Sequence, residues 1–159
     1  MKKFPFLAIA LAVVVLGAIT GFASKSQENQ ITRTQLREML VQLGWEVTDI
    51  VKDAGKEKYS VKFTKNELDI PVGFEISPSN SYVWLTVNLG DAPKEPNAKC
   101  LELLRQNGKV QPTFFYITES GRLMAALAVE NRGITNAVLR TRAETVSDNV
   151  GKTKTSWQG

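Results

Sequence analysis

The sequence of 159 residues contains no histidine and only one cysteine. Without histidine, neither a Ser-His-Asp nor a Cys-His arrangement can activate a nucleophile, and the commonest transition-metal ligand is missing. One cysteine cannot form an internal disulfide or a closed thiolate zinc site. These absences exclude the most frequent hydrolytic and metal-dependent chemistries and favour a binding protein over an enzyme.

The sequence also lacks a strong charge of either sign. The formal net charge is +4, and it falls to +2 if Lys2 and Lys3 are removed with a leader. Basic and acidic residues are interspersed, so no electrostatic footprint for nucleic acid is present. The carboxylates are scattered, and their spacing selects neither a glycosidase-like pair nor a calcium loop. We therefore predict no catalytic, cofactor-binding or metal-binding residues. A small ligand-binding domain or a carboxylate-based hydrolase remains the alternative.

The N-terminus has the features of a secretory signal peptide over residues 1–23. Met1-Lys2-Lys3 precedes an apolar stretch, and the small residues Gly21 and Ala23 precede Ser24. Residues 4–23 are also near the roughly 20 residues that cross a bilayer, so an uncleaved membrane anchor is the alternative. Both interpretations predict an extracytoplasmic chain, periplasmic or secreted. The polar residues 24–31 are interpreted as a linker.

Capping signals define the first and last helices. Thr32 and Gln35 form a capping box, and Gly44 ends the first helix. Thr135 caps the last helix, and Gly151 is expected to end it. We predict one domain over residues 32–151, followed by a polar tail over residues 152–159.

A second helix is expected from about residue 97 to residue 106. It carries Cys100, Leu101 and Leu104. Because Cys100 shares an apolar helix face with Leu104, we expect its thiol to be buried rather than paired with another chain.

Between the helices, apolar residues alternate with polar ones as they do in half-buried strands. The expected strands cover residues 45–51, 59–64, 72–77, 82–89, 114–118 and 123–129. Short turns join neighbouring strands, which makes them antiparallel. The predicted fold class is α+β: an antiparallel sheet flanked by helices, in the order α-β-β-β(β)-α-β-β-α, after the signal peptide.

Two of these strands are apolar on both faces, which is unusual for a sheet that is covered on one side. The residues opposite the predicted core form a candidate partner surface: Tyr82, Trp84, Met124, Ala126 and Ala128. Large exposed apolar patches usually mark contacts, and a second copy of the chain is the simplest partner. The alternative is that the linker, the C-terminal tail or the leader covers this face.

The segments "LREMLVQLGWEV", "LLRQNGK", "ITESGRL" and "GIT" occur in this order along residues 32–150. With the intervening strands they resemble the type III secretion chaperone-like superfamily, and within it the YbjN family. This resemblance implies an α-β-α layout, frequent homodimers, no catalytic residues, and a role in chaperoning or regulation. Chaperones of that superfamily are cytoplasmic, whereas the leader predicts export here.

The resulting functional prediction is an exported, non-enzymatic domain that binds a protein or peptide, in a chaperone-like or regulatory role. The partner is another protein or a second copy, giving a homodimer. No nucleic acid is expected, and membrane association is expected only if the leader is retained as an anchor.

Overall fold

The computed structural model of the chain describes residues 30–93 and 98–158. The predicted leader and all but the last two residues of the predicted linker lie outside this part. The elements in chain order are α1 (Arg33–Gln42), β1 (Val47–Val51), β2 (Lys58–Lys65), β3 (Leu68–Ile76), β4 (Tyr82–Asp91), α2 (Ala98–Asn107), β5 (Phe114–Ile117), β6 (Arg122–Glu130), α3 (Asn136–Lys152) and α4 (Lys154–Trp157).

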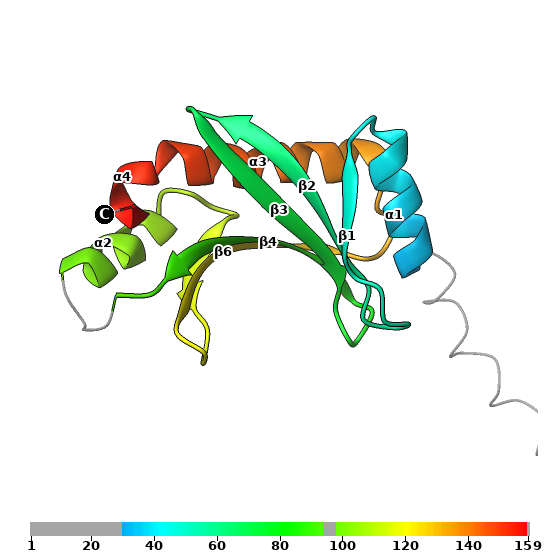
Figure 1. Cartoon of the computed structure of the whole chain (residues 1–159), viewed down its shortest axis with the longest axis horizontal. Helices are drawn as coiled ribbons and strands as arrows, with labels where there is room; N and C mark the ends of the chain where they lie inside the picture. Colours follow the sequence, from blue (N-terminus) through cyan, green and yellow to red (C-terminus); the bar gives the residue numbers. More distant parts are fainter. Residues whose placement is uncertain (1–29, 94–97, 159) are drawn as a thin grey trace, which may run out of the picture.

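The strands form one six-stranded sheet in the order β1-β2-β3-β4-β6-β5, and every neighbouring pair is antiparallel. The long helix α3 runs across one face of this sheet, with α1 and α2 near its two ends (Figure 1). We call the face beneath α3 the inner face and the opposite one the outer face. The predicted α+β class and element order are confirmed.

The core lies between the inner face and α3. Its members are buried side chains that alternate along the strands and recur along the helix: Val83, Leu85 and Val87 of β4, Leu123, Ala125 and Leu127 of β6, and Leu139, Ala143 and Val146 of α3. Burying each large aliphatic side chain stabilises the fold by roughly 1.5–3 kcal/mol. The predicted inward positions of β4 and β6 are thereby confirmed, although Leu89 and Val129 at the strand ends are only partly buried.

The predicted start of α1 is also confirmed. The Thr32 hydroxyl accepts from the backbone N–H of Gln35 at 3.2 Å, and the Gln35 side-chain oxygen accepts from the Thr32 N–H at 2.8 Å. Leu36 and Leu40 are fully buried, so the capped helix presents its apolar stripe to the core. Gly44 follows the helix with a φ of 79°, a conformation that glycine adopts without a steric cost.

The last helix begins as predicted but does not end as predicted. The Thr135 hydroxyl accepts from the Val138 N–H at 3.3 Å. Gly151 is buried inside α3, and a Cβ added there would lie 3.1 Å from the Cβ of Lys65. The glycine therefore lets the β2–β3 hairpin approach the helix closely, and the expectation that it ends the helix is wrong.

The residues after α3 form a short helix that packs against the other helices. The Trp157 indole N–H donates to the Val150 carbonyl at 2.9 Å, and its ring packs against the core. Helix α4 also contacts α2. Residues 152–158 are thus held on the helical side, and the idea that the C-terminal tail covers the outer face is wrong for these residues.

The prediction for the second helix needs a correction. Leu103 is its buried residue, whereas Leu104 is 66% exposed and Leu101 is 56% exposed. Cys100 is half-buried rather than buried. The helix packs on the edge of the sheet rather than across it, so only a narrow part of its apolar stripe reaches the core.

Candidate functional site

The outer face carries a row of four aromatic side chains. Tyr82 and Trp84 come from β4, and Phe114 and Tyr116 come from β5. The centroid distances between successive rings are 6.5 Å for Tyr82 and Trp84, 6.2 Å for Trp84 and Phe114, and 5.8 Å for Phe114 and Tyr116. We call these four residues the aromatic row. It crosses β6, which separates β4 from β5 in the sheet.

The aromatic row is exposed at both ends and half-buried in the middle. Tyr82 is 43% exposed and Tyr116 is 36% exposed, while Trp84 and Phe114 are intermediate. A row of this kind on a sheet face that no described helix covers is a marked apolar feature, because isolated exposed hydrophobic residues are ordinary but contiguous ones are not.

The five residues predicted for this surface lie on the outer face but are not equally accessible. Tyr82 and Trp84 belong to the aromatic row, Met124 is half-buried, and Ala128 is exposed opposite Trp84. Ala126 is fully buried, and it lies opposite Phe114 in the register of β5 and β6. Ala126 therefore supports the rings from below and would not touch a partner directly.

Sequence reasoning missed the other half of the row, Phe114 and Tyr116. Their alternation with buried Phe115 was readable, but the pairing of β5 with β6 was needed to place them beside Trp84. Order of strands, rather than any local pattern, brings the four rings together.

Carboxylates flank the aromatic row on two sides. Glu75 of β3 lies opposite Trp84 and forms an ion pair with Lys58. Glu130 of β6 lies opposite Tyr82 and is exposed. Burial raises the pKa of Tyr116, and the negative charge of Glu75 raises it further. Because Lys58 balances the charge of Glu75, Glu130 is the flanking carboxylate that forms no ion pair among the described residues.

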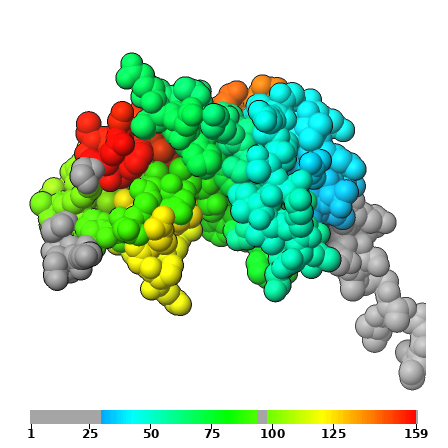
Figure 2. Space-filling model, in the orientation of Figure 1, coloured from blue at the N-terminus to red at the C-terminus, as the bar shows by residue number. Residues whose placement is uncertain are grey.

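The outer side of the molecule is hollowed. In Figure 2 the lower outline is indented between the yellow β5–β6 turn and the green and teal turns at the other end of the sheet. A second hollow of about 200 Å³ lies between α2 and β5. Its lining is almost wholly apolar: Cys100, Leu103, Leu104, Phe115, Tyr116, Ile117 and Leu123. Tyr116 borders this hollow and also ends the aromatic row.

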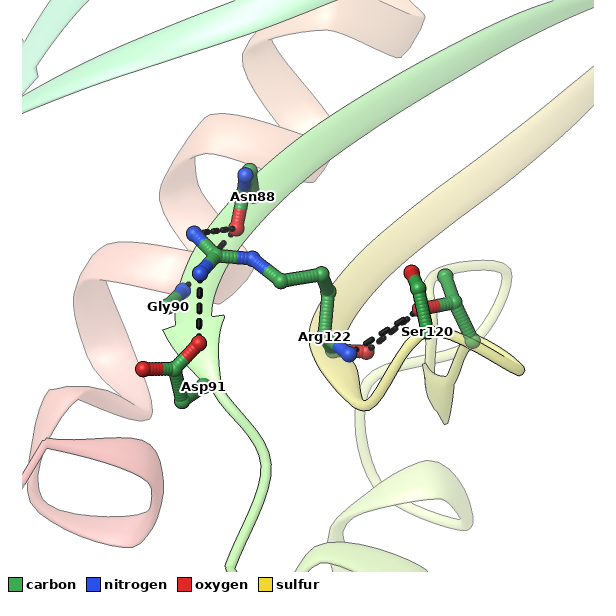
Figure 3. Close-up of polar contacts among 6 residues, drawn as sticks. Asn88, Gly90, Asp91, Ser120 and Arg122 are labelled. Carbon is green, nitrogen blue, oxygen red and sulfur yellow. Dashed lines mark hydrogen bonds and ion pairs between the residues drawn. The ribbon is translucent and has the colours of Figure 1, made fainter.

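A polar cluster fixes the end of β4 against the β5–β6 turn (Figure 3). The Arg122 guanidinium donates to the Asp91 carboxylate at 2.5 Å and to the Asn88 side-chain oxygen at 3.2 Å. The same Asn88 oxygen accepts from the Gly90 N–H at 3.0 Å, next to a shift in the β4–β6 register. Asp91 is largely exposed and already paired. The cluster stabilises the local fold and contains no reactive group.

The described part of the chain offers little chemistry. Within residues 30–93 and 98–158 no aspartate or glutamate is buried, and no group of three or more Cys, Asp or Glu side chains could hold a metal ion. None of the helices in that part is both long and apolar enough to cross a membrane. A cofactor or metal site cannot be assigned to any of these residues.

Comparisons with known proteins give a family match and a fold match. The family model for the "peptidase propeptide and YPEB domain" matches residues 7–76, which is less than half of the chain. Within the described residues this match runs from α1 to the end of β3. The family that matches is therefore not the YbjN family. Comparison with curated proteins finds no match.

Two solved assemblies contain chains that the comparison of structures matches to this one. A chain of the HopA1–SchA chaperone–effector complex is 12% identical with a TM-score of 0.51, over 79% of this chain and 91% of that one. A chain of the ExoU–SpcU heterodimer of Pseudomonas aeruginosa is 15% identical with a TM-score of 0.47, over 76% and 96%. The first likeness confirms the expected chaperone-like fold, and at such low identity it concerns the fold alone.

Proposed function

We propose that this chain is a non-enzymatic domain that binds a protein or peptide through the outer face of its sheet, in a chaperone-like or regulatory role. The observation that carries the proposal is the half-exposed aromatic row on a face that no described helix covers. Aromatic side chains are enriched among the anchors of interfaces because they bury a large area with few rotatable bonds.

The fold likeness supports a binding role without naming a partner. The solved assemblies are described as a chaperone–effector complex and as a heterodimer from a type III secretion system. The matching family is described by peptidase propeptides, which makes a peptidase one class of partner to include in a screen. Placement in the YbjN family rests on the segments quoted above and remains our inference.

The alternative of a carboxylate-based hydrolase lacks a supporting observation among the described residues. General acid catalysis by a carboxyl group at neutral pH needs a raised pKa, which burial usually provides. Asp49 and Asp69 instead have lowered pKa values, because hydrogen bonds from Arg37 and from Thr64 stabilise their charged forms.

Site-specific photo-crosslinking tests the proposal directly. A photoreactive phenylalanine analogue at Tyr82 should trap a partner in the extracytoplasmic fraction of the producing cell. The same analogue at Val138 of α3, which is 36% exposed on the opposite side, is the matched control. Equal yields of adducts from the two positions would contradict the proposal.

A homodimer is the simplest assembly for this surface, since closed two-fold dimers are the commonest. Light scattering should then report a dimer at micromolar concentration, and Trp84→Lys should convert it to a folded monomer. Circular dichroism checks the fold of the variant. If the parent protein is already monomeric, the homodimer prediction is wrong, and the partner must be a different protein or peptide.

We also propose that the domain of residues 32–151 is exported and that the leader is cleaved before Ser24. Intact-mass measurement of protein recovered from the exporting cell decides between cleavage and an anchor. A mass that still includes Met1 to Ala23 would favour the anchor.

A further inference from the structure

The rings of the aromatic row are inclined to one another. The interplanar angle is 50° between Tyr82 and Trp84, 79° between Trp84 and Phe114, and 41° between Phe114 and Tyr116. Rings that lie flat in one plane make a platform on which a sugar or a base can stack. Rings that are inclined to their neighbours leave notches between them instead. Such notches accept compact ring-shaped or branched side chains presented from a narrow backbone.

The spacing of the rings matches an extended backbone. Successive centroids are 5.8 to 6.5 Å apart. A polyproline II helix rises by 3.1 Å per residue, so two residues advance it by about 6.2 Å. The three ring-to-ring steps would therefore accommodate about seven residues of such a helix. A β-strand advances by about 6.6 Å over two residues, close to the 6.5 Å between Tyr82 and Trp84, so the choice between the two conformations depends on the hydrogen bonds of the sheet.

The place of the row in the sheet also argues against strand addition. Tyr82 and Trp84 lie on β4, which is paired with β3 on one side and with β6 on the other. The backbone groups beneath this half of the row are therefore already hydrogen-bonded within the sheet. A partner lying over Tyr82 and Trp84 must therefore be held by its side chains, and a polyproline II helix has no internal hydrogen bonds to lose.

The charges beside the row select among partners. Glu130 is exposed opposite Tyr82 and forms no ion pair among the described residues, whereas the nearby Glu75 is paired with Lys58. A carboxylate next to these rings disfavours a phosphate backbone, because single-stranded nucleic acid needs a basic groove. It favours a lysine or arginine at the Tyr82 end of the bound segment.

From this geometry we propose that the aromatic row binds a proline-rich segment of a partner protein in the polyproline II conformation, with a basic residue placed beside Glu130. The inference rests on the proposed function, because it names the class of partner for the same surface. Tyr82, Trp84, Phe114 and Tyr116 supply the notches, and the small side chain of Ala128 leaves space beside Trp84.

Fluorescence polarisation with labelled peptides tests the proposal on the mature chain. The probe is a heptaproline peptide with one terminal arginine. A peptide of alternating alanine and glutamine with the same arginine controls for charge, and heptaproline with a terminal glutamate controls for the basic residue. The expected result is saturable binding of the first peptide and at least roughly tenfold weaker binding of the alanine–glutamine peptide.

Variants then locate the site. Tyr82→Ala and Trp84→Ala should each weaken binding of the arginine-ended peptide by roughly tenfold, as loss of an aromatic anchor usually does. Glu130→Gln should remove the preference for arginine over glutamate while leaving polyproline binding in place. Val138→Ala, on the helical side, should change nothing. Because Tyr82 is 43% exposed, its loss should leave the fold intact even if Trp84→Ala does not.

Three results would overturn the proposal. One is equal affinity for the proline and the alanine–glutamine peptides, and another is binding that Tyr82→Ala leaves unchanged. The third is saturable binding of cellohexaose in place of the peptides, which would make the row a carbohydrate platform. If no proline peptide binds while crosslinking at Tyr82 still traps a protein partner, the polyproline inference is wrong and the proposed function stands. If neither occurs, both are wrong.

Discussion

The inner and outer faces of the sheet come from the same strands but differ in what covers them. On β6, Leu127 is fully buried beneath the helices, while the next residue, Ala128, is exposed. Alternation alone assigns these two residues to opposite faces. The aromatic row on the outer face has no described element above it, although its composition is close to that of a core. This difference identifies the outer face as the surface to test.

The largest effect should come from truncating the inner face. We expect Leu127→Ala or Leu40→Ala to lower the free energy of unfolding by about 2–5 kcal/mol, because both side chains are fully buried. Met124→Ala on the outer face should cost roughly 1 kcal/mol, since its side chain is only half-buried. Urea denaturation measures all three. Equal losses would mean that the two faces are equally buried in solution.

A buried polar residue holds the end of the sheet to the segment before α1. The fully buried side-chain amide of Asn131 accepts from the Ile31 N–H at 3.1 Å and donates to the carbonyls of Ile31 and Asn80 at 3.0 and 2.9 Å. Asn131→Ala leaves these groups without partners and should cost roughly 2–4 kcal/mol. Asn136→Ala, which removes an exposed hydrogen bond to Gln42, is the matched control and should change thermal stability little.

Removing the helix caps should have a smaller effect. Thr32→Ala and Thr135→Ala each remove an acceptor for a free backbone amide and should cost about 1 kcal/mol. Thr32→Ala should cost the more of the two, because Gln35 also loses the geometry of its return bond. Thermal melts in which the cap variants lose more stability than Leu127→Ala would contradict the assignment of the inner face.

Most of the fold could be predicted because its signals are local. Four elements and their buried faces were predicted correctly. The signals were the caps at Thr32 and Thr135 and the alternation along β4 and β6. The turn between β2 and β3 was missed, because its residues Asn66 and Glu67 both have positive φ and glutamate rarely signals such a turn. Because this turn was not predicted, the expected strand began at residue 72, whereas β3 begins at Leu68.

The candidate site could be predicted only in part, because it depends on contacts that are distant in sequence. Trp84 and Phe114 are brought together by β6, which follows both of them in the chain. Gly151 looked like a helix end, but its role depends on Lys65 of a distant hairpin. Cys100 was expected to be buried because it shares a helix face with Leu104, but Leu104 is exposed and Cys100 is only half-buried. Local patterns assign each residue to one face of its strand or helix. The order of strands and the placement of helices decide which of these faces are covered.

The smallest effect concerns an ion pair between α1 and β1. The Arg37 guanidinium donates to both Asp49 carboxylate oxygens, at 2.8 and 3.2 Å, and this hydrogen bonding lowers the pKa of Asp49. A carboxyl whose pKa is lowered by folding stabilises the fold above its unfolded pKa, near 4, and that contribution is lost as the pH falls through the lowered folded value. Stability should therefore decline below about pH 4.

Asp49→Asn tests this contribution, and Asp69→Asn on the outer face is the variant with which it is compared. The variant should be slightly less stable than the parent at pH 7 and should lose less stability on acidification, because the pair is absent at both pH values. Solvent and salt screen this partly exposed pair, so the difference should shrink in concentrated sodium chloride. Asp69→Asn on the outer face removes bonds within one hairpin only, from Thr64 and Lys62. Because Asp49 joins two elements and Asp69 joins neighbours, Asp49→Asn should have the larger effect in urea denaturation at pH 7. The reverse order would show that the α1–β1 pair contributes less than the bonds within the hairpin.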